Sequence, residues 1–356
     1  MSPRISIIVP CYNSARTIER TIHSVLMQNC VDWELILVDD GSSDDTAQRI
    51  RSIPDRRIHL IQQENRGPSA ARNNGINHAS GDWICFLDSD DMLLPRALDT
   101  LLAATNATSD IIIGCFQFHD HPVSSISHTT PVHLGSERLA ANTLFWQKYE
   151  EGIKLDVFRG ERVQHELNLG APWAKLYRRA FINEHKLRFH EKLVLHEDTL
   201  FNHLAYIHAS SVSIVPTPVY CYLDNPDSLT RSQNARYIEH STEALAQFLL
   251  LHPDYPEELC YFAMYRILEC WQGICSATPY TPIVRYRLVQ QFRKHPIIAK
   301  CSKLISLTNN PYFNMFEKWE LFLIKNHLLF TLVFIMPLIR AFRSLKNAHS
   351  KAFRTH

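Results

Sequence analysis

The first 115 residues alternate between short apolar strands and helices, and this pattern restricts the possible folds of the 356-residue chain more than any other feature. The predicted strands span residues 5–9, 34–38, 59–62 and 83–87, and the predicted helices span residues 15–28, 46–51 and 69–79. Strands of about five residues that alternate with helices form βαβ units and a parallel sheet. The sequence therefore predicts an α/β fold with a mostly parallel sheet flanked by helices.

The rest of the chain does not continue this alternation. Residues 119–133 are rich in Ser, Thr, Pro and His and are predicted to form a loop, whereas the chain beyond residue 236 has the apolar periodicity of helices. We expect a first domain over residues 1–235 and a mainly helical, basic extension over residues 236–356. A hydrophobic content of 46% with 21% charged residues excludes a disordered chain.

Acidic clusters end two of the predicted strands. Asp39 and Asp40 close the second strand, and Asp88-Ser89-Asp90-Asp91 follows the fourth. Ligands of parallel sheets bind at the carboxyl ends of the strands, so both clusters lie where a site is expected. Two acidic clusters repel each other unless a cation lies between them, and carboxylate oxygens suit Mg²⁺ or Mn²⁺. The alternative is that the aspartates cap the helices that follow, but three acids exceed what a cap needs.

A dinucleotide-binding oxidoreductase is the obvious competing class, because an acid also ends the second strand of those proteins. Their first turn needs glycines so that the backbone can approach a pyrophosphate. Here that turn reads Pro10-Cys11-Tyr12-Asn13-Ser14, without glycine, and the chain also lacks a P-loop. Phosphates are therefore expected to bind through a metal ion.

Four motifs in order resemble the inverting family 2 glycosyltransferases of GT-A fold, which have a Rossmann-like sheet. They are Ile7-Ile8-Val9-Pro10-Cys11-Tyr12-Asn13, Leu37-Val38-Asp39-Asp40-Gly41-Ser42-Ser43-Asp44, Asn65-Arg66-Gly67-Pro68-Ser69-Ala70-Ala71-Arg72-Asn73 and Phe86-Leu87-Asp88-Ser89-Asp90-Asp91. The resemblance is close over about the first 115 residues, the expected nucleotide-sugar-binding part, and looser to about Tyr222.

The resemblance implies a nucleotide-sugar donor, usually a uridine diphosphate (UDP) sugar, and assigns residues to it. The base is held by Pro10, Tyr12 and Asp40, the base or diphosphate lies near Arg72, the ribose side is bound by Asp88 and Ser89, and a Mn²⁺ or Mg²⁺ ion that bridges the phosphates is held by Asp90. Two of these residues have alternatives. Tyr12 is otherwise a packing aromatic, and Arg72 a solvated charge on a helix surface.

The resemblance also implies an acceptor side over residues 165–222. Asp198 is expected to be the general base, with Glu197 as the second candidate, because the attacking hydroxyl must lose a proton. The alternative is that both acids only stabilise the start of a helix. In the segment 170–177, Trp173 is expected to stack on an acceptor sugar and Lys175 to meet an acceptor phosphate, although Trp173 as plain core is the alternative.

The C-terminal part of the chain is strongly basic. Residues 285–356 contain 13 Lys and Arg and two Glu, a formal charge of +11, which leaves −10 for residues 1–284. The uninterrupted apolar run over residues 328–339 is shorter than the roughly 20 residues of a spanning helix, and basic residues from Arg340 onward follow it. We expect the 321–345 segment to be interfacial, re-entrant or packed on the core, and the tail to dock on an anionic membrane surface.

These observations together predict an inverting, metal-dependent glycosyltransferase that transfers a sugar from a UDP-sugar to a lipid-linked, lipopolysaccharide or capsular glycan, with no nucleic-acid partner. Nine scattered cysteines without a C-x-x-C pair, and no signal peptide, indicate a cytoplasmic protein on the inner face of the plasma membrane. The alternative function is that of a catalytically inactive scaffold with the same fold.

Overall fold

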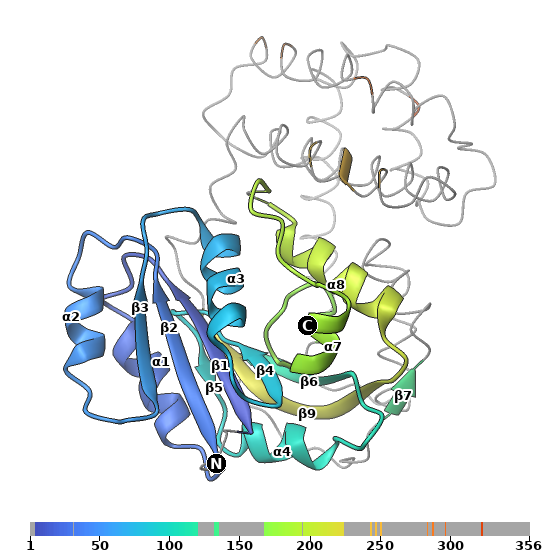
Figure 1. Ribbon diagram of the computed structural model, residues 1–356, viewed down its shortest axis with the longest axis horizontal. Helices are drawn as coiled ribbons and strands as arrows, with labels where there is room; N and C mark the ends of the chain where they lie inside the picture. Colours follow the sequence, from blue (N-terminus) through green and yellow to red (C-terminus); the bar gives the residue numbers. More distant parts are fainter. Residues whose placement is uncertain are drawn as a thin grey trace, which may run out of the picture. The chain divides into compact units, whose positions relative to one another are not determined.

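The computed structural model describes residues 4–30, 32–119, 132–134, 167–193 and 195–223, together with single positions between 243 and 322. The chain divides into two compact units, residues 1–227 and 228–356. The first unit contains every described strand (Figure 1). Apart from those single positions, the predicted helical extension over 236–356 and its basic tail lie outside the described residues. Within the ranges described here, no helix is long and apolar enough to cross a membrane.

The described strands and helices are short. The strands are β1 (Ile5–Cys11), β2 (Trp33–Asp39), β3 (Ile58–Gln62), β4 (Trp83–Phe86), β5 (Met92–Leu93), β6 (Ile111–Phe118), β7 (Val132–Leu134), β8 (Lys175–Arg178) and β9 (Val212–Tyr222). The helices are α1 (Ile18–Leu26), α2 (Thr46–Arg51), α3 (Pro68–His78), α4 (Ala97–Ala103), α7 (Arg179–Glu184) and α8 (Glu197–His208). The alternation predicted for the first 115 residues is confirmed, with α1 shorter at both ends than expected.

One sheet contains all nine described strands, in the order β3-β2-β1-β4-β8-β6-β9-β5, with β7 beside β9. The strands β1 to β4 run parallel, and β6 runs parallel to β9. β8 lies antiparallel between β4 and β6, so β6 has the direction of β4. The carboxyl ends of β1, β2, β4, β6 and β9 therefore meet at one edge of the sheet.

The prediction of a loop over residues 119–133 is wrong at the C-terminal end of that segment. Val132 pairs with Ile214 and His133 with Ser213, so the last two residues of that segment belong to the antiparallel strand β7. The strand depends on a partner about 80 residues further along the chain, which a local pattern of Ser, Thr and Pro does not reveal.

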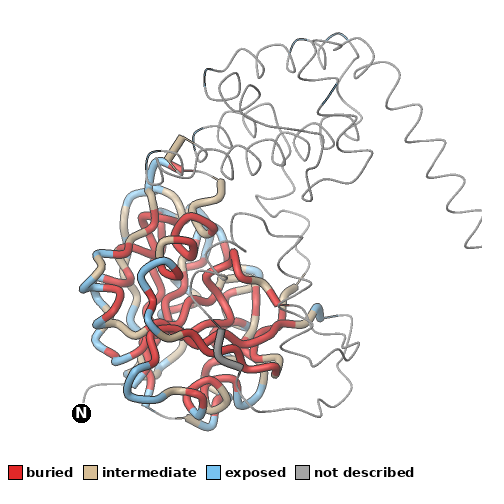
Figure 2. The backbone as a smooth tube through the Cα atoms, turned by 90° about the vertical axis from the view of Figure 1, so that its right-hand side faces the viewer, coloured by how far each residue is buried: buried red, intermediate tan, exposed pale blue. Residues whose placement is uncertain are grey.

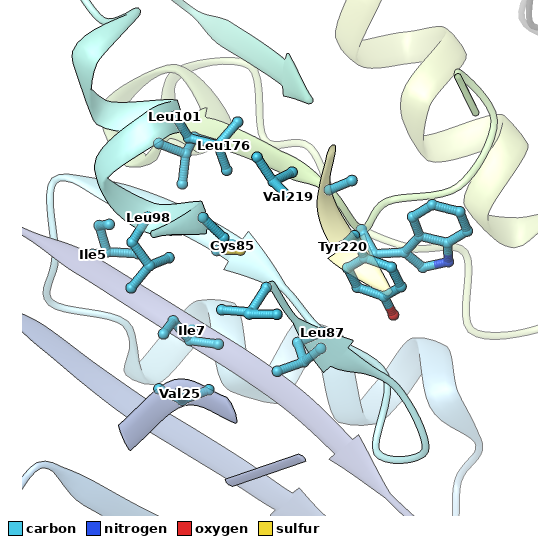
Figure 3. Packing of buried hydrophobic residues seen from close by; sticks show 14 of the residues in the cluster. Ile5, Ile7, Val25, Cys85, Leu87, Leu98, Leu101, Leu176, Val219 and Tyr220 are labelled. Carbon is cyan, nitrogen blue, oxygen red and sulfur yellow. The ribbon is translucent and has the colours of Figure 1, made fainter. Parts of the chain in front are cut away.

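The side chains of β1 alternate between two buried layers. Ile5 and Ile7 point to the face covered by α1, α2 and α4, and Figure 3 shows them packed with residues of α1 and α4. Ile8 points to the opposite face, which α7 and α8 cover. Buried residues consequently fill the interior of the described part of the first unit (Figure 2).

Helix α3 also covers that second face and approaches β1 closely. A Cβ atom built on Gly75 would lie 2.3 Å from Cγ2 of Ile8, a distance that real Cβ atoms do not adopt. Only glycine allows α3 to lie at this depth. The same helix carries Arg72, so the contact helps to set the position of that side chain.

Candidate active site

Three loops meet at the carboxyl edge of the sheet, and hydrogen bonds join them. The loop after β1 contacts the loop after β2, because the side-chain oxygen of Asn13 accepts from the backbone N–H of Ser43 at 2.9 Å. It also contacts the loop after β4, because the hydroxyls of Ser14 and Ser89 lie 2.7 Å apart. The predicted donor residues therefore come together at one edge.

Tyr12 and Pro10 lie at the end of β1. The Tyr12 side chain is 52% exposed, so the alternative of a packing aromatic is wrong. An exposed ring at this edge has a face available for stacking on a flat ligand. Pro10 is partly buried within β1, where it pairs with Val38.

Asp40 is almost fully buried at the end of β2 and accepts three hydrogen bonds. The donors are the side chain of Gln63 at 2.8 Å and the backbone N–H groups of Arg66 at 2.9 Å and Gly67 at 2.7 Å. These bonds hold the loop that leads into α3. The role of Asp40 in binding the base stays a prediction.

Asp91 anchors the acidic loop that follows β4. Its carboxylate accepts from the Tyr220 hydroxyl at 2.6 Å and from the backbone N–H of Leu223 at 2.8 Å, and the same hydroxyl accepts from the N–H of Asp88 at 3.3 Å. Burial, more than the nearby Asp88, raises the pKa of Asp91 to about 8. Asp91 thus supports the loop, while Asp88, Ser89 and Asp90 remain partly exposed.

Arg72 joins this loop to the start of α8. Its guanidinium donates to Asp88 Oδ1 at 2.9 Å and to Glu197 Oε1 at 3.4 Å. The Phe189 ring lies beneath it, with its centroid 5.3 Å from the central carbon. Since only 7% of Arg72 is exposed, the alternative of a solvated surface charge is wrong.

Glu197 and Asp198 form the first turn of α8, after His196 with a positive φ of 64°. Burial, followed by the neighbouring charge of Asp198, raises the pKa of Glu197 to about 7. Asp198 is partly exposed, and its Oδ1 accepts from the backbone N–H of Thr199 at 2.6 Å. Two carboxyl groups with different surroundings therefore lie side by side at a helix start, where anions are favoured.

Trp173 and Lys175 are buried in this structure. The Trp173 ring stacks on Tyr220 with centroids 4.5 Å apart and meets the edge of Phe116. Lys175 is fully enclosed, and its Nζ donates to the carbonyls of Asn168 at 2.7 Å and Ala171 at 2.5 Å. Both side chains are enclosed by protein atoms in this arrangement, and their acceptor roles stay predictions.

Comparison with known proteins supports the same interpretation. The family model described as glycosyl transferase family 2 matches residues 6–184. The chain belongs to this family. EpsH of Bacillus subtilis strain 168 is 31% identical over 84% of this chain and 83% of its own.

Two further similarities are to a protein whose name states an activity and to a solved structure that contains a nucleotide sugar. The Escherichia coli UDP-Glc:alpha-D-GlcNAc-diphosphoundecaprenol beta-1,3-glucosyltransferase WfgD is 44% identical over 96 residues, which cover 27% of this chain and 38% of WfgD. The crystal structure of S. aureus TarS 1-349 with UDP-GlcNAc has a TM-score of 0.64 at 19% identity, covering 93% of this chain and 89% of that one. The GT-A fold prediction is thereby confirmed, and the protein is a glycosyltransferase.

The site of this glycosyltransferase offers carboxylate oxygens that suit a cation to which substrate phosphates also bind. Within the described ranges, no group of three or more His, Cys, Asp or Glu side chains is arranged to hold a metal ion. Mg²⁺ usually needs only one or two carboxylates when substrate phosphates complete its shell. The partly exposed Asp90 supplies such a hard oxygen ligand, so the residues present fit the predicted ion.

Sequence reasoning missed the residues that support Arg72. Asn73 donates to the Phe189 carbonyl at 2.8 Å and accepts from the Phe189 N–H at 2.8 Å, which places the ring under the guanidinium. Asn73 belongs to the third motif, so its position was a usable signal. Phe189 had none, because its contact joins segments more than 100 residues apart.

Proposed function

We propose that this glycosyltransferase transfers a sugar from a UDP-sugar to a lipid-linked glycan with inversion at the anomeric carbon. The printed names of the relatives support the substrate classes. WfgD uses UDP-Glc and a diphosphoundecaprenol-linked sugar and forms a beta linkage, and TarS was crystallised with UDP-GlcNAc. A beta product from an alpha-linked nucleotide sugar is the outcome of direct displacement.

The observation that carries the proposal is the pair of contacts made by Arg72. The guanidinium contacts Asp88 on the donor side and Glu197 beside the predicted base, at 2.9 and 3.4 Å. Donor-binding and proton-accepting groups are consequently separated by one side chain. A single-step displacement needs both groups at one reacting carbon.

In this proposal the donor occupies the carboxyl edge of the sheet. Tyr12 stacks on the uracil, next to Pro10, and Asp40 accepts from the ring N–H. Asp88 and Ser89 bind the ribose side, and Arg72 lies near the diphosphate. The 52% exposure of Tyr12 supports the stacking, since that ring has a free face.

Asp90 would hold a Mn²⁺ or Mg²⁺ ion. The ion would supply Lewis-acid stabilisation of the negative charge that develops on the leaving diphosphate. The protein holds the loop for it: Arg20 donates to the Asp90 carbonyl at 2.9 Å, and the Thr21 hydroxyl contacts the Asp91 carbonyl at 2.8 Å. Both contacts come from α1, so this helix holds the loop in place.

Asp198 acts as the general base. It takes the proton of the acceptor hydroxyl while that oxygen bonds to the anomeric carbon, and the bond from this carbon to the β-phosphate oxygen breaks, which releases UDP. Glu197 is engaged by Arg72, and burial raises its pKa, so it is the less available of the two carboxylates to accept the proton of the acceptor.

The same proposal places the enzyme at the cytoplasmic face of the plasma membrane. A lipid-linked acceptor presents its sugar at the membrane surface, and the +11 charge of residues 285–356 would attract anionic lipid. The basic tail would then hold the enzyme near its acceptor.

A panel of UDP-, GDP- and dTDP-sugars tests the donor class. Binding to the full chain would be measured by calorimetry with Mn²⁺, with Mg²⁺ and with a chelator. We expect one UDP-sugar to bind only with metal. Equal binding with chelator would refute the metal role, and no binding of any member would favour a scaffold function.

A further inference from the structure

The loop before β8 directs its backbone carbonyls toward the protein interior. We call residues 168–173 the carbonyl loop, because each of its six carbonyls accepts a hydrogen bond from a side chain of β8 or α8. The bonds are Lys175 to Asn168, Ala171 and Trp173 at 2.7, 2.5 and 3.4 Å, Tyr206 to Leu169 at 2.9 Å, Asn202 to Gly170 at 2.7 Å, and Tyr177 to Pro172 at 3.3 Å. All four donor side chains are fully buried.

Lys175 makes half of these bonds. An ammonium group has three N–H donors and no acceptor, and three carbonyls surround it. A charge removed from water is costly unless it is paired, and burial lowers the pKa of Lys175 to about 7. The opposing influence on Lys175 is the negative charge of Asp198, the predicted base.

Asn202 connects the carbonyl loop to Asp198. It lies one helical turn after Asp198 on the same side of α8. Its side-chain nitrogen donates to the Gly170 carbonyl at 2.7 Å and to the Asp198 carbonyl at 3.0 Å. Its oxygen, 2.6 Å from the Tyr177 hydroxyl, is the nearer acceptor of that group's one proton, which it shares with the more distant Pro172 carbonyl. The first turn of α8 is thus attached to the loop that Lys175 gathers.

We infer that Lys175 is a positioning residue for the transfer reaction. Its ammonium group holds the carbonyl loop, and the loop, through Asn202, holds Asp198 where the acceptor hydroxyl is deprotonated. The inference rests on the proposed function, in which Asp198 is the base. It gives Lys175 a role different from contact with an acceptor phosphate.

The test uses Lys175→Met in the full chain, since Met has similar length but no N–H donors. Two quantities are measured: the affinity for UDP with Mn²⁺, and the rate of UDP release from the UDP-sugar that the wild type hydrolyses, with water as acceptor. We expect unchanged UDP affinity and a kcat lower by on the order of 10²-fold, the effect of a misplacement of about 1 Å. In an Asp198→Asn background the same change should cause no further loss, because both act on one step.

Ile182→Ala is the matched control, because Ile182 is fully buried in α7 and lies outside the carbonyl network. It should lose stability but keep kcat per folded molecule. Amide hydrogen exchange of residues 197–200 should increase in Lys175→Met and not in the control. If Lys175→Met does not fold, Asn202→Leu cuts the link to Asp198 and should give the same split between kcat and UDP affinity.

Three results overturn the inference. The first is a wild-type kcat in both Lys175→Met and Asn202→Leu. The second is a loss that multiplies with that of Asp198→Asn. The third is a wild-type chain that neither binds UDP nor hydrolyses a UDP-sugar. This third result would refute the proposed function as well, whereas the first two results leave the proposed function intact.

Discussion

Arg72 has the most demanding surroundings of any residue in the site. Its guanidinium is buried and faces the carboxylates of Asp88 and Glu197, with Asp198 nearby, so these negative charges raise its pKa against the opposing effect of burial. Removing one partner of a buried ion pair leaves an uncompensated charge, which costs about 3–5 kcal/mol. Changes at this residue therefore affect folding as well as donor binding, and the acids around it give cleaner tests of mechanism.

Asp198→Asn separates the base from the binding residues. The amide keeps the size of the side chain but cannot accept a proton, so we expect UDP affinity to stay and turnover to fall by roughly 10²–10⁴-fold. Steady-state kinetics and UDP titration would measure both. Near-normal activity of Asp198→Asn together with an inactive Glu197→Gln would make Glu197 the base.

Glu197→Gln should change how stability depends on pH. Burial raises the pKa of Glu197 from 4.5 to about 7, so between these values the folded chain keeps a proton that the unfolded chain releases. Stability of the wild type therefore falls, relative to Glu197→Gln, as pH rises from about 4.5 to about 7, by roughly 1–3 kcal/mol. Urea unfolding of both proteins across this range measures the difference, and a constant difference would contradict it.

At the scale of elements, the site depends on how helices approach the sheet. α3 lies close to β1 at Gly75, and α8 is held by the carbonyl loop, so Arg72 and Glu197 approach from two helices on the same face of the sheet. Neither helix can change its distance from the sheet without disturbing its packing, because protein interiors are packed at crystal-like density. A small change in helix depth consequently moves the charged groups at its end.

Gly75→Ala tests this coupling. The new methyl group would meet Cγ2 of the fully buried Ile8, so we expect a loss of about 1–3 kcal/mol in unfolding free energy and weaker UDP binding. Ile8→Ala removes the obstructing atom, and the double variant should lose less than the sum of the single losses. His78→Ala on the exposed side of α3 is the control and should stay within about 0.5 kcal/mol of the wild type. Simple additivity would show that the methyl group is accommodated elsewhere.

How far the sequence predicts each element depends on the range of its contacts. β1, β2 and β4 are apolar runs next to turn residues, and their local pattern was sufficient. Lys175 is the opposite case, because its partners are backbone carbonyls, which every residue has and no pattern marks. Asp91 looked equivalent to Asp88 and Asp90 until Tyr220, 129 residues away, proved to be its partner.

At the scale of the molecule, charge and chemistry are separated along the chain. The first unit, residues 1–227, contains the described sheet and all the proposed site residues. The net positive charge of the sequence comes from residues 285–356, within the second unit. Surface recognition and sugar transfer should therefore respond differently to solution conditions, since exposed charges are screened by salt and buried pairs much less.

Vesicle flotation of the full chain tests the basic tail. We expect binding to vesicles with phosphatidylglycerol but not to pure phosphatidylcholine, and release as salt shortens the screening length from about 10 Å at 0.1 M to about 3 Å at 1 M. Replacing Arg340, Arg343 and Lys346 by Gln should weaken binding while UDP affinity stays. Vesicle binding that depends on neither salt nor lipid charge would refute the electrostatic anchor. Membrane association that persists after truncation at Tyr312 would refute it as well.

The carbonyl loop has a practical consequence for protein engineering. Every residue has a backbone carbonyl, so the side chains of residues 168–173 take no direct part in the bonds that their carbonyls accept. Within this loop only Asn168 is partly exposed and the other five residues are buried, so changes that conserve side-chain volume should leave the attachment of Asp198 in place. The four donors, Lys175, Tyr177, Asn202 and Tyr206, offer no such freedom and should be kept constant in any attempt to redirect acceptor choice.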